Sequence, residues 1–106
     1  NVATVRNTWI GRVISDPPVE HPNIRFVLDF DADAFPPLKG GMQLSGQVEN
    51  SDGAKFVADT IARVPEKNLI RYVIEITEPT KATDLRARLK IGNSEVSETW
   101  TYTWQP

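Results

Sequence analysis

The end of the chain alternates between two kinds of side chain with a period of two, and it does so in two successive segments. Residues 85–91 alternate leucine, alanine and isoleucine with basic side chains. In residues 98–104, a glutamate and then three aromatic side chains alternate with threonines. Successive side chains of a strand point to opposite faces, so each segment predicts a strand with one solvated face. Gly92-Asn93 lies between them and is typical of a turn. The pattern predicts a β-hairpin.

The same alternation recurs along most of the chain. It is strongest in residues 24–30, where Ile24, Phe26, Leu28 and Phe30 share one face. The segments between the expected strands are rich in proline, glycine, asparagine and aspartate, which break strands or form turns. Further strands are expected over residues 2–14, 42–48 and 69–77, with loops over residues 15–23 and 31–41 and a turn over residues 50–53. The sequence therefore predicts an all-β fold, an Ig-like antiparallel β-sandwich of about seven strands, in a single domain over residues 1–106.

One segment, Ala54–Val64, fits two structures. Val57, Ile61 and Val64 have the spacing of a helical stripe, whereas alternate residues from Phe56 to Val64 have the spacing of a strand. The all-β surroundings favour the strand, and the sequence leaves the helix open.

Charge and composition limit the classes of partner. The formal net charge of −2 gives no basic footprint for nucleic acid or an anionic membrane. No run of apolar residues is long enough for a transmembrane helix, so no membrane insertion is expected. The absence of cysteine excludes disulfides and thiolate metal sites. The first four residues lack the features of a signal peptide, which is the expectation for a mature secreted chain or a domain cut from a larger one.

Two motifs of the closing hairpin are also similar to a known family. DLRARL, from Asp84 to Leu89, and SETWTYTW, from Ser97 to Trp104, resemble the final strands of the periplasmic glucan biosynthesis proteins of the G/D family. Upstream, residues 3–6 and the segment IRFVLDF at residues 24–30 resemble the same family. All of these segments resemble the family's small C-terminal Ig-like domain. In the family, the glucan-binding cleft and any glucan-cleaving acids belong to the larger N-terminal domain.

The resemblance implies a periplasmic, non-catalytic accessory or interaction domain. Its partner would be a glucan-handling domain, another member of the envelope glucan machinery, or a β-glucan itself. The alternative is a free-standing carbohydrate-binding module that uses exposed tryptophans. An apolar patch on one face would favour partner docking, and exposed rings flanked by polar groups would favour the module.

Aromatic side chains are the candidates for sugar or partner binding, because the apolar faces of sugars stack on flat rings. Trp9 and Trp104 are expected near the rim of the fold, where they could contact a carbohydrate or a partner domain. Trp100 and Tyr102 are expected to fill the sandwich core instead.

Acidic residues do not form a convincing catalytic or metal site. Asp29, Asp31 and Asp33 alternate, but they lack the glycine and the distal glutamate of a calcium loop and are expected to be a solvated strand end. His21 is the only histidine and is expected to be a plain surface residue. No catalytic residue, metal site or cofactor is predicted.

Basic residues form a stripe on one strand, at Arg86, Arg88 and Lys90. No aromatic side chains interleave with them, as a reader of single-stranded nucleic acid would require. The stripe is expected to be a solvated strand face or a polar contact with another domain.

Overall fold

The computed structural model describes residues 2–51 and 54–106, so half of the turn predicted at residues 50–53 lies outside the described residues. Within that part of the chain there are eight strands, two short 3-10 helices and no α-helix. Ala54–Val64 contains a strand, which resolves the ambiguity of that segment. The strands are β1 (Val5–Arg12), β2 (Ile24–Asp31), β3 (Leu44–Asn50), β4 (Phe56–Val64), β5 (Leu69–Ile76), β6 (Thr83–Ile91), β7 (Ser94–Glu95) and β8 (Trp100–Trp104), and the 3-10 helices are η1 (Ala32–Ala34) and η2 (Pro65–Lys67).

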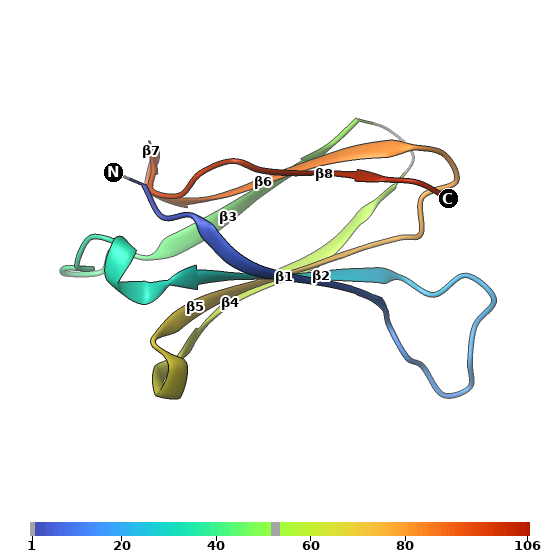
Figure 1. The fold of residues 1–106 in the computed structure, drawn as a ribbon, viewed down its shortest axis with the longest axis horizontal. Helices are drawn as coiled ribbons and strands as arrows, with labels where there is room; N and C mark the ends of the chain where they lie inside the picture. The colour runs from blue at the N-terminus through green and yellow to red at the C-terminus, as the bar shows by residue number, and fades with distance from the viewer. Residues whose placement is uncertain (1, 52–53) are drawn as a thin grey trace.

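The strands form two antiparallel sheets that lie face to face as two layers (Figure 1). The first sheet has the order β1-β2-β5-β4. In the second sheet, β3 pairs with one edge of β6, and β7 and β8 pair with the other. With β7 and β8 together as the last strand, this is the four-plus-three arrangement of an Ig constant-type sandwich. The predicted all-β sandwich is confirmed.

The core lies between the two sheets and is built by the alternation that the sequence shows. Along β2 and β5, every second side chain is buried, and the same holds along β6. Burying one face of each strand removes its apolar side chains from water while the other face stays solvated. The main contributors are Ile24, Phe26, Leu28, Phe30, Tyr72, Ile74, Ile76, Leu85, Ala87 and Leu89.

The closing hairpin is less regular than its sequence suggests. Lys90 pairs with Glu95, but Ala87 pairs with Trp100, so the return strand carries two more residues than β6 between these pairs. In this interval the amide of Leu89 donates to the hydroxyl of Ser97 at 2.8 Å. The extra length splits the single return strand that the alternation predicts into β7 and β8.

The N-terminal segment fills the space opened by this irregularity. Ala3 forms a parallel bridge with Ser97, in which its amide donates to the carbonyl of Val96 at 3.0 Å and its carbonyl accepts from the amide of Glu98 at 2.7 Å. The chain then crosses to the first sheet and begins β1 (Figure 1). Strand β1 is therefore shorter than the predicted strand over residues 2–14, because its first residues belong to the other layer.

At the opposite side of the sandwich, Tyr72 of β5 forms a polar contact with β4 and packs against β3. The hydroxyl of Tyr72 donates to Asp59 of β4 at 2.6 Å, and burial, together with this carboxylate, raises the pKa of Tyr72. The Tyr72 ring lies so close to Gly46 of β3 that a Cβ there would come within 2.0 Å of the hydroxyl oxygen. Asp59 and Ile61 are more buried than Ala58 and Thr60, so the buried face of β4 is not the even-numbered one that the strand alternation suggested.

Candidate functional site

The two tryptophans expected at the rim lie in different environments. Trp9 pairs with Val27 and is 51% exposed, whereas its neighbour Ile10 pairs with the buried Phe26. Trp9 therefore points away from the sandwich core, on the outer face of the first sheet. Trp104, at the end of β8, packs against the core. The structure does not join the two rings into one platform.

The environment of Trp104 is that of a structural side chain. Its Nε1 atom is buried and has no hydrogen-bond partner in the structure. The guanidinium carbon of Arg12 lies 5.9 Å from the centroid of its ring. Arg12 in turn forms an ion pair with Glu78, so the end of β1 is tied to the residues that follow β5.

Trp9 lies against one member of a partly buried ion pair. The guanidinium carbon of Arg71 lies 5.7 Å from the centroid of the Trp9 ring. Arg71 Nε donates to Asp29 Oδ1 at 2.9 Å and Nη2 donates to Oδ2 at 3.1 Å. These hydrogen bonds raise the pKa of Arg71. A bidentate pair of this kind has a fixed geometry, so it fixes the guanidinium on which the indole rests.

The burial of Asp29 corrects the sequence-based expectation. Asp29 was expected to be a solvated strand end, but its side chain is 0% exposed. Its carboxylate is not left to solvent because it is bound through two hydrogen bonds by Arg71, its cross-strand neighbour on β5. Asp31 and Asp33 do lie at the strand end, where Asp31 accepts a hydrogen bond from the amide of Asp33 at 3.0 Å and caps η1.

A cavity of about 390 Å³ lies beside the Trp9 ring, on and around the outer face of β1 and β2. Gly11 lies on the same face as Trp9, and a Cβ added to it would meet nothing within 4 Å. A second hollow of about 220 Å³ continues across β5 and β4 and shares Arg25 with the first. The first is lined by Trp9, Ile10, Gly11, Arg12, Val13, Ile14, Arg25 and Val27, and the second by Arg25, Ala58, Asp59, Thr60, Val73 and Glu75.

Polar side chains between the two hollows are held by one another. Arg25 Nη2 lies 3.1 Å from Glu75 Oε1, and Asn23 Nδ2 donates to Glu75 Oε2 at 2.9 Å. The hydrogen bond from Asn23, followed by that from Arg25, lowers the pKa of Glu75. Glu75 is therefore an ionised carboxylate at neutral pH.

His21 is an exposed side chain, as predicted, and it has a defined partner. Its Nδ1 atom lies 3.0 Å from Glu78 Oε1, and its side chain is 72% exposed. The contacts of Glu78 with His21 and then with Arg12 lower the pKa of Glu78. These contacts tie the loop after β1 to the end of β5. Among the described residues, no group of three or more possible metal ligands is gathered.

Trp100 and Tyr102 pack against the core, which confirms the prediction for both rings. They stack on each other with centroids 5.8 Å apart, and each meets Phe26 edge-on at 5.7 Å. Both remain partly exposed, because β8 is at the edge of its sheet.

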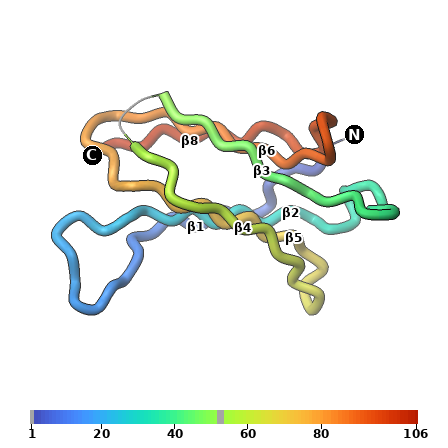
Figure 2. The backbone as a smooth tube through the Cα atoms, turned by 180° about the vertical axis from the view of Figure 1, so that it is seen from behind, coloured from blue at the N-terminus to red at the C-terminus, as the bar shows by residue number. Residues whose placement is uncertain are grey.

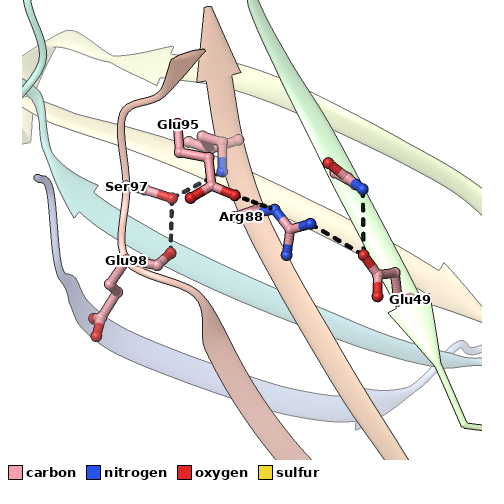
Figure 3. A network of polar contacts seen from close by, with 7 residues as sticks. Glu49, Arg88, Glu95, Ser97 and Glu98 are labelled. Atoms are coloured by element: carbon pink, nitrogen blue, oxygen red, sulfur yellow. Dashed lines mark hydrogen bonds and ion pairs between the residues drawn. The ribbon is translucent and has the colours of Figure 1, made fainter. Parts of the chain in front are cut away.

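The basic stripe lies on the outer face of the second sheet, but it is only partly solvated. Arg86 is exposed and Lys90 is partly buried, and the Arg88 side chain is only 16% exposed, so the expected solvated face is wrong for Arg88. Arg88 of β6 lies between two carboxylates, with Nη2 3.1 Å from Glu49 Oε1 and Nε 2.9 Å from Glu95 Oε1 (Figure 3). The contact with Glu95 is an ion pair without hydrogen-bond geometry. Ser97 and Glu98, close by in the same view, belong to the irregular part of the hairpin (Figure 3).

Sequence reasoning missed the residues that surround Trp9, namely Arg71, Arg25 and Glu75. A signal for them was present in the alternation of β5. The face of β5 opposite the core carries Arg71, Val73 and Glu75. Charged and apolar side chains are mixed there, although a solvated face does not require an apolar residue.

Comparison with models of known protein families identifies the family of the chain. A model of the family described as "Periplasmic glucan biosynthesis protein, MdoG" matches residues 1–104. A search of curated proteins returned no match. No helix within the described part of the chain is long and apolar enough to cross a membrane.

Proposed function

Because the chain belongs to the periplasmic glucan biosynthesis protein family, we propose that it is a non-catalytic accessory domain that acts in the periplasm. It supports a glucan-handling domain or a partner from the envelope glucan machinery. The family match over residues 1–104 is the observation that carries this proposal, since it covers nearly all of both sheets.

The electrostatics of two partly buried carboxylates, Glu75 and Glu78, support the non-catalytic part of the proposal. Glycoside cleavage uses two carboxyl groups, one of which must hold a proton at the working pH and therefore has a raised pKa. The pKa values of Glu75 and Glu78 are lowered by their hydrogen-bond partners. A carboxylate stabilised in its ionised form is a poor general acid at neutral pH.

The test is a cleavage assay on the purified chain. We expect no release of reducing ends from linear β-linked glucans above the level of a buffer control. The matched variants are Asp31→Asn and Asp33→Asn, which change carboxyl groups at the end of β2 without touching the core. Release of reducing ends by the chain, abolished by either variant, would show that it is an enzyme.

A carbohydrate-binding module is the second candidate function, and one observation favours it. Trp9 exposes half of its surface beside a hollow of about 390 Å³. Trp104 does not contribute to such a module in this arrangement, because its ring packs against the core and its Nε1 atom is buried. A sugar-binding role therefore depends on Trp9.

A further inference from the structure

We propose that the outer face of the first sheet binds an uncharged glucan directly, with one sugar ring stacked on Trp9 and neighbouring hydroxyls bound by Arg25 and Glu75. The inference rests on the proposed accessory function and deepens it, because it gives this domain its own contact with the polysaccharide.

Trp9 has the properties of a stacking platform. Its side chain is half exposed, although exposing the apolar surface of an indole to water is unfavourable. Its position is fixed, because Arg71 lies against the ring and is itself fixed by the buried Asp29. A ring already fixed in the free protein loses little conformational freedom when a ligand stacks on it, which favours binding.

The hollow beside the ring matches the two-sided chemistry of a sugar. Val27 and Val13 provide apolar surface for the C–H groups of a pyranose, and the absence of a side chain at Gly11 leaves room next to the indole. Arg25 and Glu75 lie side by side and offer planar donors and acceptors to adjacent hydroxyls. A volume of about 390 Å³ is at the small end of ligand sites and suits a short saccharide segment.

Charge pairing on this face favours an uncharged ligand. Three arginines contact the Trp9 platform or line its hollow, and each has a carboxylate partner. An anionic polymer would have to compete with these carboxylates, whereas a neutral glucan can add hydrogen bonds and leave the pairs in place. The pairs are Arg12 with Glu78, Arg25 with Glu75, and Arg71 with Asp29.

The experiment is a calorimetric titration of the purified chain with linear glucans that cover each β-linkage between glucose residues. We expect saturable binding of at least one of them. Trp9→Ala should weaken it at least about tenfold, the scale on which stacking on an aromatic ring acts. Trp9→Phe keeps a smaller aromatic ring, so its affinity for the glucan should lie between that of the unmodified chain and that of Trp9→Ala. Thr101→Ala, on the outer face of the second sheet, is the matched control and should bind as the unmodified chain does.

The outcomes separate the inference from the proposed function. Failure of the unmodified chain to bind any of the glucans, or equal affinity in Trp9→Ala at an unchanged melting temperature, would overturn the inference alone. Association of the Trp9 face with a protein partner in place of glucan would also overturn it and leave the accessory function standing. Release of reducing ends would instead contradict the proposed function. If Trp9→Ala loses its fold, Arg25→Ala provides the second test, since it removes a hydroxyl-binding group from an exposed position.

Discussion

The outer faces of the two sheets differ in what they present to water. The outer face of the second sheet is polar throughout its central part, where basic side chains and threonines alternate with the core residues. The outer face of the first sheet combines charged side chains with a tryptophan and two valines that pair across strands. The residues are Arg86, Arg88, Lys90, Thr101 and Thr103 on the second sheet, and Trp9, Arg25, Val27, Arg71, Val73 and Glu75 on the first.

The difference between the two outer faces bears on whether such a face needs large apolar side chains. The second sheet shows that a face of this sandwich can be stable with no large apolar side chain on it. Apolar residues on the first face are therefore not a general requirement of an outer face in this sandwich. A surface that mixes an exposed aromatic ring with fixed polar groups is typical of a binding site.

The ion pairs of the two faces also differ. On the first face, Asp29 is completely buried and binds Arg71 through two hydrogen bonds. On the second face, Arg88 binds Glu49 and Glu95, which are both about half exposed. Water reaches the carboxylates of the second face more than it reaches Asp29, so the Asp29–Arg71 pair is screened less and should contribute more to stability.

The largest expected effect comes from breaking the buried pair. Asp29→Asn removes a charge that Arg71 neutralises, and we expect a loss of about 3 kcal/mol in the free energy of unfolding, at the low end for buried pairs because Arg71 is partly exposed. Glu49→Gln is the control on the other face and should cost less than about 1 kcal/mol. Urea denaturation of the three proteins measures both values. Similar losses at the two sites would mean that the two faces are energetically alike.

A smaller effect is expected within β8, where one strand contributes to both the core and the outer face. Trp100→Ala removes an edge-on contact with Phe26 and a stack with Tyr102, and we expect a loss of about 2 kcal/mol, below that of a fully buried ring. Thr101→Ala, on the outer face, should change stability by no more than about 0.5 kcal/mol. Denaturant midpoints for both variants test this. An effect of Thr101→Ala as large as that of Trp100→Ala would show that the outer face of this sheet contributes to packing.

The smallest effect is a pH dependence on the first face. Asn23 and Arg25 hold the pKa of Glu75 below its ordinary value of 4.5, so the stability it contributes is present above that pH and is lost as the pH falls through the lower pKa of the folded state. Glu75→Gln lacks this titration. Melting temperatures between neutral pH and pH values below 4.5 should therefore fall less steeply for Glu75→Gln than for the unmodified chain. Parallel curves would mean that these contacts do not stabilise the ionised form.

The sequence was a good guide to the core and a poor one to the candidate site. Alternation identified the buried sides of β2, β5 and β6, because every second side chain of a strand with one solvated face points into the core and is apolar. It also placed Trp9 among the candidates. It misjudged Asp29, which is bound by Arg71 of the neighbouring strand β5. It also grouped Trp9 with Trp104, because distance along the chain does not say which face a side chain occupies.

The sequence by itself determined the family, the all-β class, the hairpin turn and the residues that face inward along the central strands. These properties are local, since they depend on the period of the side chains and on short motifs. Only the tertiary structure decided that Asp29 and Arg71, 42 residues apart, form a buried pair, and that this pair supports Trp9. Strand order decides which side chains become neighbours across a sheet, and alternation is the same for every order of the same strands.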